Sequence, residues 1–313
     1  MILYHGTTIH IEKIDLQKSK PNKDFGKGFY LSADKTQAMA MAAYKAEQTG
    51  GEPILNAFEF DEALLTNNSL KVKIFEAYDK EWADFILAIL KKNKITDGLV
   101  LELGCGTGKL MSLLGNAGFD MIGVDNSVDM LQIAREKTSP EFLYLLQDMR
   151  EFELYGTVKA VVSVCDSVNY ITEKEDLTEV FRLVNNYLDP KGLFIFDFNT
   201  DYKYRDMIGE TVIAEDREDV SFIWFNEYDE ESQLNDIDLK VFVQEDGDCY
   251  RKFQEEHIQR GYSLQEIKQM LEESGLVFLQ AFDEYSNQEP RTDSGRIVVV
   301  AQENGKEKQE ETE

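Results

Sequence analysis

The stretch LVLELGCGTG, residues 99–108, decides the fold of this chain. Its apolar first half predicts a central strand that is covered on both faces of a sheet. Gly104, Gly106 and Gly108 then predict a tight turn into a helix, because glycine accepts positive φ and lets a ligand approach the backbone. Their G-x-G-x-G spacing differs from the G-x-G-x-x-G of dinucleotide-binding folds. Glu102, two positions before the first glycine, would repel a pyrophosphate but suits a ligand that carries ammonium and sulfonium groups.

A second strand-and-turn unit follows at residues 120–125, DMIGVD. Asp125 ends this apolar strand about 20 residues after the first glycine, where sheets of this type bind ribose hydroxyls. A helix is expected to begin at Ser127. Taken alone, the glycine turn is explained equally well as a plain strand-to-helix connection. Two successive units instead favour a nucleoside-binding α/β sheet.

These motifs resemble those of the class I S-adenosylmethionine (SAM)-dependent methyltransferases. Four segments carry the resemblance: ELGCGTG at 102–108, GVDNS at 123–127, LQDM at 146–149 and CDSVNY at 165–170. The resemblance runs from about residue 80 to about residue 303 and is closest to bacterial small-molecule methyltransferases. It implies a Rossmann-like, seven-stranded α/β fold with an antiparallel β insertion late in the chain.

The resemblance also implies which residues bind SAM. The glycine turn lines the methionine and ribose portion, Glu102 holds the ammonium group, and Asp125 accepts both ribose hydroxyls. Asp148 accepts the exocyclic amine of adenine or, alternatively, caps the next helical turn. The expected cofactor-binding residues are Glu102, Gly104, Cys105, Gly106, Gly108, Asp125, Asn126, Met130, Asp148, Met149 and Cys165.

Three side chains are candidates for the chemistry itself. Methyl transfer needs alignment of the reactants, exclusion of water, and a proton acceptor where the nucleophile carries a proton. Asp166 either orients the substrate or the methionine group or is a solvated loop carboxylate, and Tyr170 either walls the pocket or belongs to the core. His257, in the insertion, has the ordinary pKa of a general base near neutrality, and its alternative is an exposed or structural strand residue.

Residues 1–78 differ in charge from the remainder. They hold nine basic and ten acidic residues, whereas the whole chain holds 33 and 60 and has a net charge of −27. This shift predicts a domain boundary near residue 78. The segments YHGT at 4–7 and DFGKGFYLS at 24–32 resemble an uncharacterised bacterial family related to ADP-ribosyltransferases, which implies NAD contacts at His5 and Tyr30. Because no catalytic glutamate is evident before residue 78, an inactive fragment is the alternative.

The remainder of the chain alternates strands with helices, which predicts a mainly parallel sheet with helices on both faces. Helices are expected over 79–95, 174–188 and 263–274, the last with a capping box of Ser263 and Glu266. Strands are expected at 142–146, 159–165 and 192–197, the last after a turn at 189–192, and edge strands at 277–283 and 296–301. An insertion at about 200–260 is expected to form antiparallel strands. The charged tail, residues 304–313, is expected to be disordered.

The composition argues against several kinds of partner. The acidic excess opposes binding to a phosphate backbone, so nucleic acid is not expected as a substrate. Three widely spaced cysteines predict no disulfide framework and no metal site, and they favour a reducing compartment. No signal peptide opens the chain and no apolar run reaches about 18 residues, so a cytoplasmic protein without a membrane span is expected. The oligomeric state stays open.

The sequence therefore predicts an enzyme that transfers a methyl group from SAM to the oxygen or nitrogen nucleophile of a small molecule. Two alternatives remain, an NAD-dependent ADP-ribosyltransferase-like protein and a SAM-binding module without catalysis. A glutamate on a strand opposite His5 would favour the first. A cofactor site without an adjoining substrate cavity would favour the second.

Overall fold

The computed structural model describes residues 2–11, seven residues between 35 and 46, and residues 51–59, 78–216, 220–245 and 249–306. Two compact units make up the chain, Met1–Phe75 and Glu76–Glu313. Tyr30 and tail residues 307–313 lie outside the described residues.

The described part of the first unit contains a two-stranded antiparallel sheet, β1 (Ile2–Thr7) with β2 (Ile54–Glu59). His5 on β1 pairs with Asn56 on β2. The Asn56 side chain then fixes the chain beyond β1, because it bonds the carbonyl of Ile9 and the amide of Ile11.

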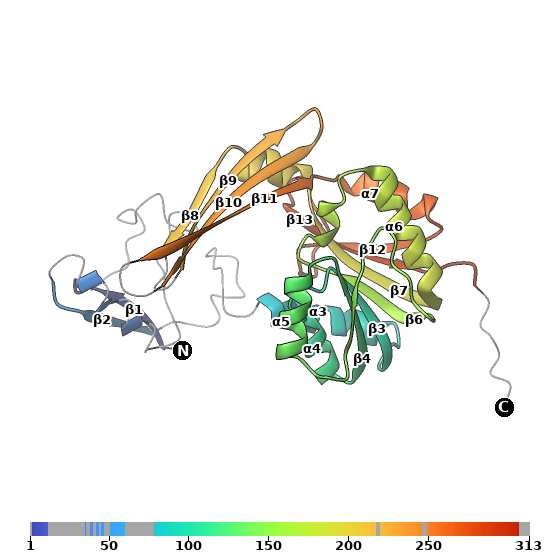
Figure 1. The fold of residues 1–313 in the computed structure, drawn as a ribbon, viewed down its shortest axis with the longest axis horizontal. Coiled ribbons are helices and arrows are strands. Elements are labelled where there is room, and N and C mark those ends of the chain that lie inside the picture. The colour runs from blue at the N-terminus through green and yellow to red at the C-terminus, as the bar shows by residue number, and fades with distance from the viewer. Residues whose placement is uncertain are drawn as a thin grey trace. The chain divides into compact units, whose positions relative to one another are not determined.

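The second unit is built on a seven-stranded sheet with the order β12-β13-β7-β6-β3-β4-β5, as Figure 1 shows. Neighbours among β3 to β7 are parallel, whereas β13 is antiparallel to both β7 and β12. The predicted sheet, largely parallel with an antiparallel edge, is thereby confirmed. The strands are β3 (Gly98–Leu103), β4 (Phe119–Asp125), β5 (Leu143–Leu146), β6 (Val158–Ser163), β7 (Leu188–Asn199), β12 (Val277–Asp283) and β13 (Arg296–Gln302).

Helices cover both faces of this sheet and bury their apolar stripes against it. On one face pack α6 (Lys174–Tyr187) and α7 (Leu264–Glu273), for example through Phe181 and Leu271. On the other face pack α3 (Tyr78–Lys92), α4 (Lys109–Asn116) and α5 (Val128–Lys137). Both bonds of the predicted capping box, Ser263 with Glu266, are present at the start of α7.

The insertion is a separate antiparallel sheet of four strands in the order β11-β10-β9-β8. Its strands are β8 (Val212–Asp216), β9 (Val220–Asp229), β10 (Leu234–Gln244) and β11 (Tyr250–Arg260). In Figure 1 this sheet extends away from the seven-stranded sheet, and β11 leads the chain back to it.

Two local expectations were wrong. The antiparallel strands expected from about residue 200 begin only at Val212, because Lys203–Ile208 form a short π-helical turn, η3. A single turn anchored by the buried Tyr204 is too short to show a sequence period. The strand expected at 192–197 begins earlier, at Leu188, and the turn expected at 189–192 is an irregularity inside β7, where Lys191 adopts a φ of 66° and the pairing with β6 shifts register. Within the described residues, no helix has the length and apolar character that crossing a membrane requires.

Candidate functional site

The strand order reverses at β3, with β4 and β5 on one side and β6 and β7 on the other. Open α/β sheets bind ligands at such a point, outside the carboxyl ends of the strands. The glycine turn begins here, and Gly104, Gly106 and Gly108 have φ values of 71°, 50° and 72°. A Cβ on Gly106 would meet no atom within 4 Å, so this backbone adjoins open space beside the start of α4.

Glu102 lies buried behind the glycine turn, with 3% of its surface exposed. The backbone amide of Met111 bonds its carboxyl group, but Oε2 is buried and has no hydrogen-bond partner among the described residues. Burial raises the pKa of Glu102 well above its ordinary value. The hydrogen bond from Met111 lowers this pKa and the negative charge of Asp125 raises it, but both effects are smaller than that of burial. An unpartnered buried carboxyl of this kind fits a ligand with a cationic amine.

Asp125 ends β4 and holds two loops together. Its Oδ2 accepts the amide of Gly106 at 2.8 Å, and its Oδ1 accepts the amide of Ser127 at 2.8 Å. A carboxylate oxygen has two lone pairs, so each oxygen keeps one further acceptor site. Asp125 can therefore shape the glycine turn and still accept a pair of neighbouring hydroxyls.

The predicted adenine-binding residues lie around the ends of β4 and β5. Asn126 and Met130 are exposed at the start of α5, and Met149 lies beside Gly104. Asp148 is held by Arg150, whose Nη2 lies 2.6 Å from Oδ2 and whose amide and Nε bond Oδ1. The guanidinium lowers the pKa of Asp148. Asp148 thus stabilises a turn at residues 148–151 and not the start of a helix, and its Oδ2 keeps one free acceptor site.

On the other side of β3, the chain after β6 adopts an unusual backbone conformation. Cys165 and Asp166 have φ values of 57° and 52°, and such left-handed residues cost about 1–3 kcal/mol each. Asp197 on β7 stabilises this turn, because its fully buried carboxylate accepts the amide of Cys165 at 3.2 Å and the amide of Asp166 at 2.7 Å. Strain held in place by a buried carboxylate is typical of a functional site.

Arg296 at the start of β13 neutralises the negative charges of the two carboxylates at this turn. Its Nη1 lies 2.8 Å from Asp197 Oδ2 and its Nη2 lies 2.6 Å from Asp166 Oδ1, while the hydroxyl of Tyr285 also donates to Asp197. Burial opposes the charge on Arg296, but the two carboxylates outweigh it and raise the pKa of the guanidinium. An acid inside the apolar run GLFIFDFN was a signal for Asp197, whereas nothing in the sequence singled out Arg296.

The insertion completes this group of polar residues through β11. Gln259 donates to Asp166 Oδ2 at 2.8 Å and accepts the hydroxyl of Tyr204 at 2.8 Å. We call the set Asp166, Asp197, Gln259, Tyr285 and Arg296 the strand-end cluster.

The three predicted catalytic residues meet at β11. Asp166 reaches it through Gln259, and Tyr170 Oη lies 3.5 Å from His257 Nδ1 with the two rings edge to face. The other ring nitrogen of His257, Nε2, lies 3.2 Å from Glu255. Both ring nitrogens of His257 therefore face a partner.

The strand-end cluster adjoins the glycine turn. A Cβ on Gly104 would lie 2.5 Å from the hydroxyl oxygen of Ser167, the residue after Asp166. A ligand that lies along Gly104 and Gly106 therefore ends beside the turn of Cys165 and Asp166. This arrangement places the carboxyl groups of Glu102 and Asp125 at the glycine turn and the hydrogen-bonding side chains of the strand-end cluster next to it.

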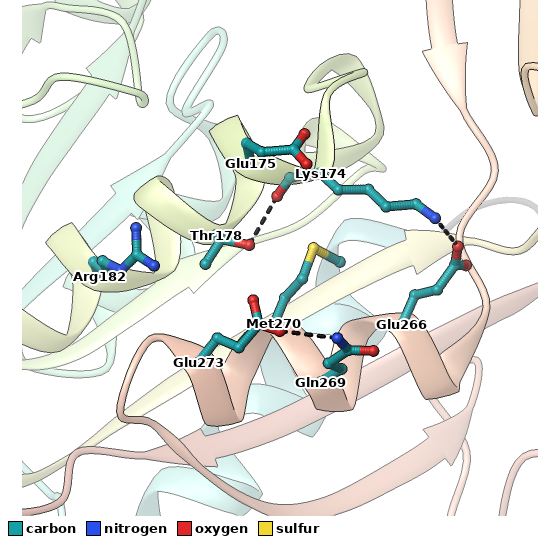
Figure 2. A pocket seen from close by; sticks show the side chains of 8 residues that line it. All are labelled: Lys174, Glu175, Thr178, Arg182, Glu266, Gln269, Met270 and Glu273. Carbon is teal, nitrogen blue, oxygen red and sulfur yellow. Dashed lines mark hydrogen bonds and ion pairs between the residues drawn. The ribbon is translucent and has the colours of Figure 1, made fainter.

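A different hollow lies between α6 and α7 (Figure 2) and has a volume of about 340 Å³. Its polar side chains largely bond one another, as Lys174 does with Glu266 at 2.5 Å and Gln269 does with Glu273 at 2.8 Å. None of its lining residues belongs to the strand-end cluster or to the predicted cofactor set.

Two family models match different parts of the chain. One is described as a protein of unknown function (DUF3990) and matches residues 1–101. The other is described as a methyltransferase domain and matches residues 100–192. Because the N-terminal match carries no activity, the ADP-ribosyltransferase-like resemblance of residues 1–78 is not confirmed.

Two relatives match about three quarters of the chain, and a third matches a shorter part. The putative methyltransferase YqeM of Bacillus subtilis is 35% identical over 230 residues, which cover 72% of this chain and 90% of YqeM. A solved SAM-dependent methyltransferase from Clostridium acetobutylicum superposes with a TM-score of 0.68 at 30% identity, over 74% of this chain and 94% of that one. A Streptomyces venezuelae dTDP-3-amino-3,4,6-trideoxy-alpha-D-glucopyranose N,N-dimethyltransferase is 32% identical over 98 residues, 31% of this chain and 41% of that protein.

Proposed function

The chain belongs to the SAM-dependent methyltransferases, enzymes that take their methyl group from SAM, and we propose that its acceptor is a small molecule with an oxygen or nitrogen nucleophile. The strand-end cluster is the observation that carries this proposal. It supplies hydrogen-bonding groups directly beside the glycine turn, where an acceptor has to lie for in-line transfer. A module that only binds SAM has no need of such a cluster.

The roles in cofactor binding follow from the hydrogen-bond acceptor sites that Glu102 and Asp125 have left. SAM supplies an electrophilic methyl group attached to a sulfonium. We assign its ammonium to Glu102, whose buried Oε2 has no other partner among the described residues. The ribose hydroxyls are assigned to the two free acceptor sites of Asp125. The glycine turn follows Glu102 in the chain, and its Gly106 amide bonds Asp125.

The acceptor roles fall to residues on the other side of β3. Both oxygens of Asp166 are held, one by Arg296 and one by Gln259, so the carboxylate is fixed in place and can orient an N–H or O–H group. Tyr170 and His257 pack edge to face at the surface beside it, and we assign them to binding the acceptor. A base role for His257 requires that its ring give up Tyr170 or Glu255 first.

A relative and the charge of the chain both favour a small, polar acceptor. One matching relative is named for N,N-dimethylation of a nucleotide-linked amino sugar, which supports a small polar acceptor. A net charge of −27 disfavours a polyanion such as nucleic acid.

A calorimetric and radiochemical test decides the proposal. Titration with SAM, S-adenosylhomocysteine and NAD should show binding of the first two and no tight binding of NAD. Transfer of tritiated methyl from SAM should then be screened against amino sugars, including dTDP-linked ones, against phenols and simple amines, and against RNA and protein. Turnover of a small molecule supports the proposal. Turnover of RNA or protein alone, or SAM binding without any turnover, contradicts it.

Whether the first unit takes part in SAM binding is the subject of a separate proposal. The charge shift places a domain boundary near residue 78, and YqeM aligns with 72% of the chain. We therefore propose that removal of residues 1–78 leaves SAM affinity unchanged, as calorimetry on the shortened chain would show. A shortened chain that fails to fold or to bind SAM would make the first unit part of the methyltransferase.

A further inference from the structure

Lys203 is a partly buried amine that the roles assigned so far do not use. It lies at the start of η3, immediately beyond β7, and its Nζ donates to Asn199 Oδ1 at 2.8 Å. A lysine has three N–H donors, and the described residues provide a partner for only this one. Two positions on Nζ therefore stay open to a ligand.

A chain of hydrogen bonds joins Lys203 to the strand-end cluster. Asn199 donates to the hydroxyl of Tyr204 at 3.0 Å, and that hydroxyl donates to Gln259 at 2.8 Å. Gln259 in turn donates to Asp166 at 2.8 Å. Each side chain in this chain is fixed by its neighbours, so Nζ is held in a set position relative to Asp166.

The charges around Lys203 come from four elements of the second unit. Arg296 lies on β13, Asp197 on β7, Asp166 after β6 and Glu284 after β12. Burial and then the Arg296 guanidinium lower the pKa of the Lys203 ammonium to about 8, while the three carboxylates act in the opposite direction. At neutral pH the Lys203 amine is therefore unprotonated in part of the molecules, and only the unprotonated amine can accept a proton as a general base.

We propose that Lys203 is the general base of the methyl transfer, accepting the proton of the acceptor nucleophile on Nζ. This inference rests on the proposed function. The nucleophile's lone pair forms the new bond to the methyl carbon, and the methyl–sulfur bond breaks with its electron pair on sulfur, leaving S-adenosylhomocysteine. The N–H or O–H proton of the acceptor passes to the neutral amine, which becomes an ammonium and later returns the proton to water.

Lys203 is better placed for this task than His257. Both ring nitrogens of His257 face side chains, whereas Nζ of Lys203 has open positions. Lys203 also joins the same bonded network as Asp166, the residue assigned to orienting the acceptor.

The first experiment needs no acceptor and therefore stands apart from the proposed function. Trace labelling with acetic anhydride over a pH series, read by mass spectrometry, gives the titration midpoint of Lys203, with the surface Lys268 as internal reference. The midpoint should lie near 8 and should fall by about half a unit or more when SAM replaces S-adenosylhomocysteine, because a sulfonium next to Nζ disfavours a second cation. A midpoint that is the same with both ligands would place Lys203 away from the transferred methyl and overturn the proposal.

The second experiment separates a base from a positive charge. With the best acceptor of the methyl-transfer screen, Lys203→Met and Lys203→Arg should both lower kcat by about a hundredfold or more, since arginine keeps the charge but does not deprotonate. SAM affinity should stay within about threefold for both variants. The rise of kcat with pH up to about 8 in the parent should disappear in Lys203→Met, and Lys268→Met should match the parent. Near-parental kcat in Lys203→Arg would show that only the charge matters.

Discussion

Gln259 Nε2 lies 2.8 Å from Asp166 Oδ2, although 93 residues separate them in the chain. The contact joins the last strand of the insertion to the turn after β6. The amide of Asn169 reinforces it by bonding the carbonyls of Asn199 and Arg260. The insertion is therefore bonded to the carboxyl ends of the parallel strands, and its residues belong to the same site as the glycine turn.

Asp125→Ala should weaken SAM binding by at least about 2 kcal/mol, some thirtyfold, because two charge-assisted hydrogen bonds to the ribose are lost. The variant also frees the amides of Gly106 and Ser127, so the glycine turn loosens along with the ribose contact. Calorimetric titration with SAM measures the effect. Asp129→Ala, an exposed acid on α5, is the matched control and should bind as the parent does.

Glu102 should make SAM binding depend on pH. Its pKa is raised in the free protein, so the carboxyl is protonated over a wider range than usual, and a bound ammonium favours the ionised form. Binding should therefore release protons, and SAM affinity should rise as pH increases through the free-protein pKa. Calorimetry in two buffers of different ionisation enthalpy counts the protons. Glu102→Gln should bind SAM more weakly and without this release, and equal proton release in the variant would point to another group.

Arg296→Met should destabilise the second unit by about 3–5 kcal/mol, because it leaves the fully buried Asp197 carboxylate without its cation. Urea unfolding of the parent and the variant measures the difference. Adding Asp197→Asn should recover part of the loss. Arg291→Met removes an arginine whose side chain is 62% exposed and should change stability by no more than about 1 kcal/mol. A loss no larger than that of Arg291→Met would show that Arg296 is dispensable for stability.

Tyr170→Phe and His257→Gln should act on the acceptor and spare SAM. Tyr170→Phe removes the hydroxyl that faces His257 Nδ1, and His257→Gln removes the imidazole ring of the edge-to-face pair, so the acceptor KM should rise about three- to tenfold while kcat stays within about twofold. Steady-state kinetics at saturating SAM separates the two parameters. A collapse of kcat in His257→Gln at unchanged KM would make His257 the base and would argue against Lys203.

Much of the cofactor half of the site could be predicted from short stretches of sequence. The glycine turn, the acid before it and the acid that ends β4 lie within residues 99–125, and their backbone conformations follow from local rules. The periodicities of 2 and 3.6 likewise located most strands and helices. The helical turn η3 is too short to show a period in the sequence, and the prediction of strands at these residues was wrong.

The acceptor half was decided by tertiary structure. Asp197 and Arg296 are 99 residues apart and meet only because β13 lies antiparallel beside β7. Lys203, Gln259 and Tyr285 reach the same place from a helical turn, the insertion and the chain after β12. Ion pairing and the lowered pKa of a lysine depend on burial and on charges brought in from distant strands. A local pattern carries neither, so the sequence alone could not say which of the 33 basic residues would lie there.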